Sequence, residues 1–191
     1  MALDIVILGP PGAGKGTQAQ RISAELGVPH ANTGDMLRAE TKAGTELGRQ
    51  AADVMSRGEL MPDEIVIELI RRRLGEDDAA RGIVIDGFPR TLAQARALDR
   101  ILAEMERELT VVLDFQIPED IAAERLLGRA RPDDRPEVIR RRLDVQRVPD
   151  ELVEYYRAKG ILVGIHADRS VDEVFAEVQS VLETAAARLP R

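Results

Sequence analysis

Short apolar runs alternate with amphipathic helical segments along most of the chain. The apolar runs contain β-branched residues and lie at residues 3–8, 82–86, 111–115 and 161–165. Apolar residues recur at helical spacing over residues 63–74, 92–109 and 171–187. Apolar runs that alternate with helices are typical of a parallel sheet covered on both faces. With a further short strand predicted at residues 29–32, the pattern predicts an α/β fold with a five-stranded parallel sheet and helices on both faces.

Two segments interrupt this alternation. Residues 35–43 and 46–57 carry helical patterns that end at Gly44 and Gly58, with no strand predicted between them, so we expect a small helical insert. Residues 125–147 contain eight arginines and only four acidic residues. This local excess of cations stands out because the formal net charge of the whole chain is −7.

Composition narrows the class of protein. A chain of 191 residues suits one domain, and 44% hydrophobic with 32% charged residues is typical of a globular protein. The negative net charge argues against nucleic acid and anionic membranes as partners. Cysteine is absent, which excludes disulfides and thiolate metal sites. We find no signal peptide and no apolar stretch of membrane-spanning length, so we expect a cytoplasmic location.

A glycine-rich turn follows the first predicted strand. Residues 9–17 (GPPGAGKGT) fit the phosphate-binding pattern G-x-x-x-x-G-K, although Gly16 stands where Ser or Thr usually follows the lysine. Glycines allow successive N–H groups to converge on phosphate oxygens, and the next helix offers its positive end. The chain has three lysines against 24 arginines, so Lys15 is an unusual choice here. We predict a phosphate loop; a glycine-rich turn without a ligand is the alternative.

Three motifs in a fixed order resemble those of the adenylate kinases. They are GPPGAGKGTQ at 9–18, NTGDMLR at 32–38 and DGFPRT at 86–91. The similarity extends from the N-terminus to about Leu143 and, more loosely, to the C-terminus. It implies phosphoryl transfer from ATP to AMP, giving two ADP, in adenine nucleotide homeostasis and AMP salvage. It also implies a P-loop NTPase-type core at 1–31, 62–127 and 135–191, an NMP-binding insert at 32–61 and a short lid at 128–134.

The resemblance further implies roles for individual residues. Those expected to bind ATP are Gly12, Ala13, Gly14, Lys15, Gly16, Thr17, Arg125, Arg129 and, through its backbone, Arg169. Those expected to bind AMP are Thr33, Arg38, Glu59, Leu60, Met61, Gly87, Phe88, Pro89, Arg90, Gln94, Arg131 and Arg142. Those expected to act on the transferring group are Lys15, Arg90, Arg129, Arg131 and Arg142. We expect ATP, AMP and ADP as the partners of a monomer.

The resemblance also has gaps that bear on the site. The family's long lid insert, which binds zinc in some members, is missing, and without cysteine we expect no zinc in the lid. Ala31 and Asn32 replace the usual Ile-Ser, a mild change beside the AMP pocket. At residues 146–152 the usual aromatic residue and Thr-x-Pro-Leu are replaced by QRVPDEL. We expect the last change to affect packing under the lid rather than chemistry.

Arginine suits phosphoryl transfer, because a planar guanidinium can bridge oxygens of donor and acceptor phosphates. Of the consecutive Arg140, Arg141 and Arg142, helical geometry lets only one face the site, and the others would decorate a solvated surface. A phosphate monoester is mostly a dianion at pH 7 and needs no general base. We therefore expect His30 and His166 to be structural.

Asp86 ends a predicted strand, where a carboxylate can orient waters of an ATP-bound Mg²⁺ with Thr17 on the other side. A structural hydrogen bond to the phosphate loop is the alternative.

Thr91 and Gln94 fit a helix capping box, and Gln94 also fits recognition of adenine, whose edge pairs a donor with an acceptor. Pyrimidine-accepting relatives tend to have Ala in place of Thr33, so the comparison favours AMP over CMP or UMP.

Three other functions were weighed against an adenylate kinase. A UMP/CMP kinase differs only in the acceptor, and assays with the three monophosphates separate the two. A switch GTPase is disfavoured because the chain has no Asn-Lys-x-Asp motif. A protein that binds nucleotide without turnover shares the phosphate loop, and a Lys15→Met variant tests for it.

Overall fold

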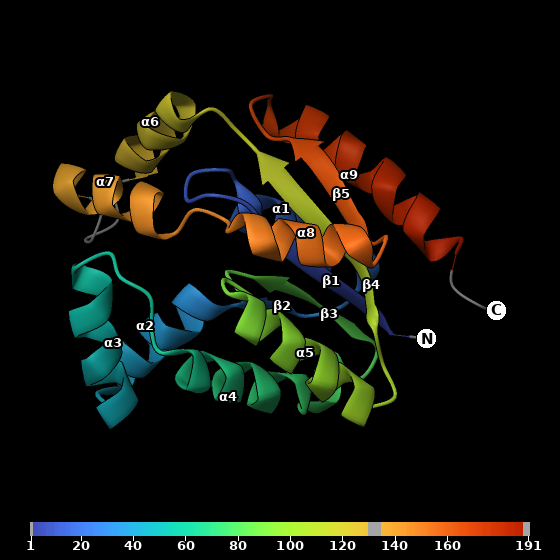
Figure 1. Cartoon of the computed structure of the whole chain (residues 1–191), viewed down its shortest axis with the longest axis horizontal. Helices are drawn as coiled ribbons and strands as arrows, with labels where there is room; N and C mark the ends of the chain where they lie inside the picture. The colour runs from blue at the N-terminus through green and yellow to red at the C-terminus, as the bar shows by residue number, and fades with distance from the viewer. Residues whose placement is uncertain (1, 130–134, 189–191) are drawn as a thin grey trace.

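The computed structural model describes residues 2–129 and 135–188, and it shows an α/β fold with a five-stranded sheet (Figure 1). The strands are β1 (Leu3–Leu8), β2 (His30–Asn32), β3 (Gly82–Asp86), β4 (Leu109–Gln116) and β5 (Leu162–His166). They pair in the order β2-β3-β1-β4-β5, and every pairing is parallel. The fold class predicted from the apolar runs is therefore confirmed.

Two hydrophobic cores lie on opposite faces of the sheet. Ile5 and Ile7 of β1 pack with α1 (Lys15–Leu26) and α9 (Val171–Ala186), whereas Val6 and Leu8 pack toward the opposite face. That second face is covered by α4 (Asp63–Leu74), α5 (Leu92–Glu104) and α8 (Asp150–Ala158). Because both faces are buried, the strands need apolar residues at successive positions, which explains the lack of polar alternation in their sequences.

One predicted helix was too long. We expected residues 92–109 to form a helix, but α5 ends at Glu104 and Leu109 already begins β4. Glu106 has a φ of 55°, in the left-handed region, and turns the chain between the two elements. Leu109 carries the helical apolar spacing only by coincidence, since its buried side chain belongs to the sheet.

The remaining helices flank the carboxyl end of the sheet. Helices α2 (Thr33–Ala43) and α3 (Glu46–Ser56) follow β2 with no strand between them, as the helical patterns predicted. Across the same end lie α6 (Glu119–Arg129) and α7 (Pro136–Val145), facing α2 and α3 (Figure 1). A 3-10 turn, η1 (Asp77–Ala79), leads into β3. Ligands of open parallel sheets bind at this end. A cleft lies there, lined by residues of α2 on one side and of α6 and α7 on the other.

Two adjacent tyrosines on α8 differ in whether the hydroxyl has a hydrogen-bond partner. The Tyr156 side chain is fully buried, and its hydroxyl has no hydrogen-bond partner within residues 2–129 and 135–188. Removing an unsatisfied buried hydroxyl costs little, so Tyr156→Phe should leave the free energy of unfolding unchanged or raise it by up to about 1 kcal/mol. The neighbouring Tyr155 donates its hydroxyl to Asp99, and Tyr155→Phe should cost about 1 kcal/mol. Urea unfolding of both variants measures the difference, and a larger loss in Tyr156→Phe would contradict this account.

Candidate active site

The glycine-rich turn curls tightly between β1 and α1. Gly9, Gly12 and Gly14 have φ values of 138°, 87° and 80°, which other residues rarely adopt. A Cβ atom on Gly12 would lie 2.4 Å from the Ala122 carbonyl oxygen, and one on Gly9 would lie 2.7 Å from that of Phe115. The turn is therefore packed against the backbone of α6 and β4, and only glycine fits at these two positions.

Lys15 lies at the start of α1 with its ammonium directed back over this turn. Its Nζ donates a hydrogen bond to the Pro10 carbonyl, at 2.8 Å. Desolvation lowers the pKa of the Lys15 ammonium from 10.5 to about 8; the Asp86 carboxylate opposes this shift, whereas Arg90 and Arg129 add to it. A desolvated cation surrounded by other cations is stabilised by any bound anion, so the turn suits a polyphosphate.

The lowered pKa of Lys15 predicts how the activity depends on pH. Lys15 is cationic below about pH 8 in the free protein and loses its charge above it. Because kcat/KM reports the free enzyme, kcat/KM for ATP should fall above pH 8, approaching tenfold for each pH unit. Bound phosphates raise the pKa, so kcat should hold to higher pH. Steady-state rates at fixed free Mg²⁺ measure both, and a flat kcat/KM up to about pH 9.5 would contradict the assignment.

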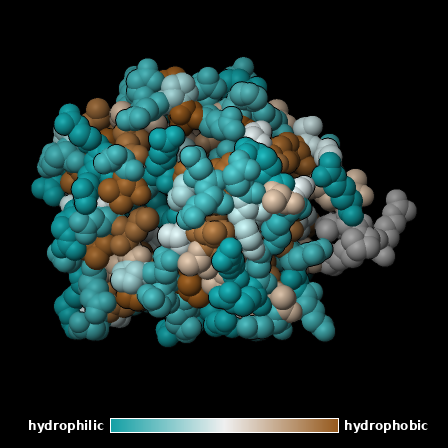
Figure 2. Space-filling model, viewed as in Figure 1, coloured by the Kyte–Doolittle hydropathy of each residue, from teal (hydrophilic) through white to brown (hydrophobic). Residues whose placement is uncertain are grey.

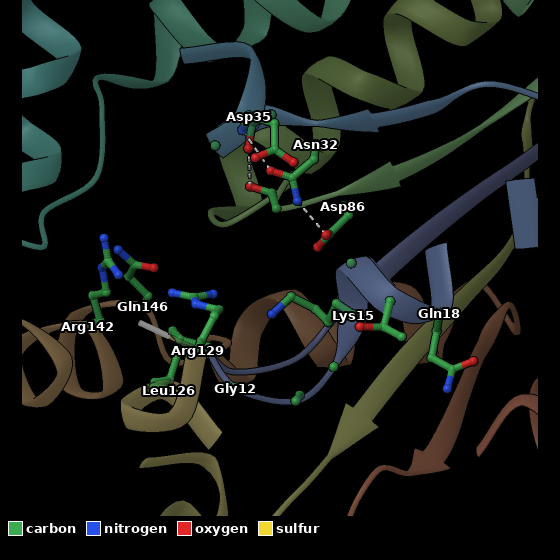
Figure 3. A pocket seen from close by; sticks show the side chains of 18 of the residues that line it. Gly12, Lys15, Gln18, Asn32, Asp35, Asp86, Leu126, Arg129, Arg142 and Gln146 are labelled. Carbon is green, nitrogen blue, oxygen red and sulfur yellow. Dashed lines mark hydrogen bonds between the residues drawn. The ribbon is translucent and has the colours of Figure 1, made fainter. Parts of the chain in front are cut away.

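A cleft of about 630 Å³ opens at the carboxyl end of the sheet (Figure 3). The glycine-rich turn at residues 9–17, from here on called the phosphate turn, forms one part of its wall, and the helices α2, α6 and α7 form others. Most residues expected at the site contribute to this wall, namely Gly12, Ala13, Gly14, Lys15, Gly16, Thr17, Thr33, Arg38, Glu59, Leu60, Met61, Gly87, Arg90, Gln94, Arg125, Arg129, Arg142 and Arg169. Phe88 and Pro89 lie behind it, with Phe88 fully buried in the core. Arg131 lies outside the described residues.

Arg142 is the arginine of its run that faces the cleft. Its side chain is buried and lines the wall, whereas Arg140 and Arg141 are exposed to solvent. Figure 3 shows Arg142 and Arg129 on one side of the cleft, with Lys15 across from them. The prediction from helical geometry that only one of the three faces the site is confirmed. Together with Arg90, these side chains bring four cations to one cleft.

Hydrogen bonds between β2, β3 and α2 shape the wall beside α2. Thr33 donates its hydroxyl to the Gly87 carbonyl, at 3.0 Å, and Arg90 Nε donates to the same oxygen, at 2.8 Å. A Cβ atom on Gly87 would lie 2.7 Å from the Thr33 hydroxyl oxygen, so Gly87 also has to be glycine. Arg38 pairs with Asp35 within the first turns of α2 and remains one-third exposed in the cleft.

The Thr91–Gln94 pair combines capping with a side-chain network. The Thr91 hydroxyl caps α5 by accepting from the backbone N–H of Gln94, at 3.1 Å, and it donates to the Asp63 carboxylate, at 2.7 Å. Gln94 accepts from the Arg90 backbone N–H, at 2.7 Å, and its Nε2 donates to Asp63, also at 2.7 Å. The reciprocal bond of a capping box would go to Thr91, so the capping motif is only half formed. Each end of the Gln94 side-chain amide makes one of its two possible hydrogen bonds in this network.

Asp86 lies at the end of β3, buried between the phosphate turn and β2. Burial raises the pKa of its carboxyl, but the nearby His30 and Lys15 and the hydrogen bond from Asn32 hold that pKa below its usual value. Asn32 Nδ2 donates to Asp86 Oδ2, at 2.5 Å, and Asn32 Oδ1 caps α2 by accepting from the Asp35 amide, at 2.9 Å. His30 Nε2 is 3.8 Å from the same carboxylate. Asn32 and His30 both line the cleft; sequence reasoning placed Asn32 beside the AMP pocket without its bond to Asp86, and it did not place His30 there.

The wall beside α6 and α9 is fixed through Arg125. Its guanidinium donates to the carbonyls of Ala167, at 2.7 Å, and Arg169, at 3.2 Å, and so holds the loop between β5 and α9. The Arg169 side chain pairs with Glu177, whereas the backbone carbonyl of Arg169 accepts the hydrogen bond from Arg125. Gln18 donates its Nε2 to the Val171 carbonyl, at 2.8 Å, which ties α1 to the start of α9.

The donor set suits a magnesium ion held through its waters. Within residues 2–129 and 135–188, no three His, Asp or Glu side chains converge as metal ligands. Asp86 and Thr17 both line the cleft, and a Cβ atom on the intervening Gly16 would lie 3.5 Å from Asp86 Oδ2. One buried carboxylate and one hydroxyl beside a phosphate turn fit a hydrated Mg²⁺ carried in by ATP.

Comparisons with known proteins agree with this geometry. Residues 7–161 match the family model described as adenylate kinase. An adenylate kinase of Corynebacterium urealyticum is 47% identical over 171 positions, which cover 89% of this chain and 93% of that protein. One of Thermodesulfovibrio yellowstonii is 40% identical over 211 positions, covering 94% of this chain and 98% of that protein. The chain therefore belongs to the adenylate kinases, the enzymes that transfer a phosphoryl group from ATP to AMP.

Proposed function

We propose that the cleft holds ATP and AMP together, with ATP on the phosphate turn and AMP against α2 and the residues between α3 and α4. One observation carries this arrangement: Lys15, Arg90, Arg129 and Arg142 come from four separate parts of the fold and line the same cleft. Lysine and arginine side chains that converge on one cleft supply the positive charge and the N–H donors that phosphate oxygens accept from. Two nucleotides with facing phosphates match this set of donors.

The residues act by position and charge. An oxygen of the AMP phosphate forms a bond to the γ-phosphorus of ATP while the bond from that phosphorus to the β–γ bridging oxygen breaks, so ADP leaves and a second ADP forms. The acceptor is already a dianion at neutral pH, so no side chain has to remove a proton. Lys15 and the arginines stabilise the charge that spreads over the transferring oxygens.

We propose that Mg²⁺ accompanies ATP and that Thr17 and Asp86 orient its waters. When bound, the ion neutralises phosphate charge and holds the donor in line. Asp86 is suited to this work because its pKa is held below the usual value, which keeps the carboxylate ionised across the neutral range. The absence of cysteine leaves no thiolate site for zinc in the 128–134 segment.

The acceptor is proposed to be AMP rather than a pyrimidine monophosphate. Thr33, Met61 and Gln94 line the same side of the cleft, and the free positions on the Gln94 amide match the donor and acceptor edge of adenine. Initial rates with ATP plus AMP, CMP or UMP under identical Mg²⁺ test this. We expect kcat/KM for AMP to exceed the other two by at least about a hundredfold, which is what a site built around specific hydrogen bonds can achieve. Comparable rates with CMP or UMP would refute it.

We further propose a cytoplasmic monomer with a core, an insert at 32–61 that closes over the bound nucleotides and a short lid at 128–134, of which residues 130–134 lie outside the described part of the chain. Among the described residues, the exposed large hydrophobic side chains are Leu127 and Val171. Hydrophilic residues cover most of the face in Figure 2, and hydrophobic ones form scattered groups rather than one broad patch. No helix in the described ranges is long and apolar enough to cross a bilayer. Sedimentation of the purified chain tests the monomer.

A further inference from the structure

Gln146 occupies a place in the cleft that its sequence position did not suggest. It caps the C-terminus of α7, and its side chain enters the cleft beside Arg142 (Figure 3). Its Oε1 accepts a hydrogen bond from Arg90 Nη1, at 2.8 Å, and its Nε2 donates to the Gly58 carbonyl, at 3.1 Å. One uncharged side chain thus joins α7, the β3–α5 loop and the turn after α3.

Chemistry fixes which way this amide points. A guanidinium nitrogen only donates and a backbone carbonyl only accepts, so exchanging the oxygen and nitrogen of Gln146 would lose both bonds. Arg90 therefore has a dedicated acceptor, and Gly58 a dedicated donor. No other amide side chain in the described part of the chain bonds to Arg90's guanidinium.

The partners of Arg90 leave its charge available. Its Nε donates to the Gly87 carbonyl and its Nη1 to Gln146, both uncharged acceptors, and within the described residues its Nη2 donates to no protein group. A carboxylate in place of Gln146 would hold the guanidinium equally well but would neutralise it. An uncharged anchor fixes the plane of the guanidinium while keeping its attraction for a phosphate.

The other bond of Gln146 reaches the end of the helical insert. Gly58 has a φ of 72°, and a Cβ atom there would lie 3.2 Å from the Val138 carbonyl oxygen and 3.3 Å from Arg142 Cγ. The turn after α3 is therefore packed directly on α7. Arg141 adds a contact to Glu59, at 3.6 Å. Gln146 lies at the centre of this junction and ties it to Arg90.

We propose that Gln146 is a positioning residue that aims the Arg90 guanidinium at the acceptor phosphate and couples it to the docked turn at residues 57–59. The inference rests on the proposed role of Arg90 in binding AMP. It differs from a packing role for Gln146, because packing alone would not distinguish the two substrates.

Two substitutions separate these roles. Gln146→Met keeps an unbranched side chain of similar length but removes both hydrogen bonds. Loss of a hydrogen bond to a charged group should lower kcat/KM for AMP by about tenfold or more, while KM for ATP changes by less than about twofold. Gln146→Glu keeps the shape but pairs a negative charge with Arg90, so its loss of kcat/KM for AMP should be larger still. Gln50 lies exposed on α3 outside the cleft wall, and Gln50→Met and Gln50→Glu serve as matched controls.

Arg90→Lys and the Arg90→Lys/Gln146→Met double variant complete the experiment. In the Arg90→Lys background, Gln146→Met should have a smaller effect on kcat/KM for AMP than in the wild type. Lysine lacks the Nη1 atom that bonds to Gln146, so there is no guanidinium left to position. Thermal melts monitor folding of each variant, and Gln146→Glu carries the test if Gln146→Met does not fold. Wild-type kinetics in Gln146→Met, or equal losses of kcat/KM for ATP and AMP, would overturn the inference about Gln146. If Arg90→Lys is defective in the same experiment, the proposed function still stands. Wild-type kinetics in Arg90→Lys would overturn both.

Discussion

Replacing Lys15 with methionine should abolish turnover, with kcat reduced by about a thousandfold or more, equivalent to about 4 kcal/mol of transition-state stabilisation. Lys15 is the one lysine in the cleft wall, and its ammonium lies over the turn where the β and γ phosphates are proposed to bind. Methionine has a similar length but no charge, so the oxygens of the transferring group lose one of the cations proposed to stabilise them. ADP formation from ATP and AMP measures the effect.

Lys42→Met is the matched control for this variant. Lys42 is exposed on α2 and does not line the cleft, so its loss should leave kcat within about twofold of the wild type. ATP binding by the Lys15→Met variant, measured by calorimetry, separates a loss of affinity from a loss of chemistry. Full activity in Lys15→Met would refute the proposed role of Lys15 in phosphoryl transfer.

Sequence reasoning located the strands because burial on both faces of a parallel sheet demands consecutive apolar residues. Residues 3–8 and 82–86 were predicted with the bounds that the structure shows. The boundary between α5 and β4 was missed because it depends on the left-handed conformation of Glu106, a residue with no strong preference for turns. Backbone reversals without glycine, proline or asparagine leave little trace in a sequence.

The candidate site was predictable as far as charge and glycine spacing carry information. Lys15 and the glycines around it form a contiguous motif. Helical geometry limited the three arginines at 140–142 to one that faces the site, and the family resemblance pointed to Arg142. The place of Gln146 was not predicted: its segment was expected to affect packing under the lid, and nothing in the sequence indicated that its amide bonds to Arg90 inside the cleft. These two residues are 56 positions apart, and an uncharged amide gives no signal of a partner at that distance.

The same reason explains why the bond between Asn32 and Asp86 was not predicted. Asn32 was placed beside the AMP pocket as a departure from a family pattern, but its bond to Asp86 depends on the parallel pairing of β2 with β3. Pairing places Asn32 directly beside Asp86 in register. A three-residue strand such as β2 is too short to reveal its register from its own sequence, so the contact could only be found in the folded chain.

Replacing Asp86 with asparagine should reduce kcat by about a hundredfold and raise the Mg²⁺ concentration needed for half-maximal activity. Asparagine keeps the shape of the side chain but removes the negative charge that is proposed to orient metal-bound waters and that stabilises the cationic forms of Lys15 and Arg90. Rates measured across a Mg²⁺ titration at saturating ATP and AMP give both quantities. Asp78→Asn, at an exposed position outside the cleft wall, should leave both unchanged and is the control.

The Mg²⁺ titration also distinguishes the two roles considered for Asp86. If the carboxylate only braces the phosphate turn and Asn32, the variant should lose stability and kcat while its Mg²⁺ dependence stays as in the wild type. If the carboxylate orients metal-bound waters, the half-maximal Mg²⁺ concentration rises even where thermal melts show a folded protein. The buried carboxylate faces Lys15 and Asn32 at the same time, so some loss of stability is expected in either case. The shift in Mg²⁺ dependence is therefore the measurement that decides between them.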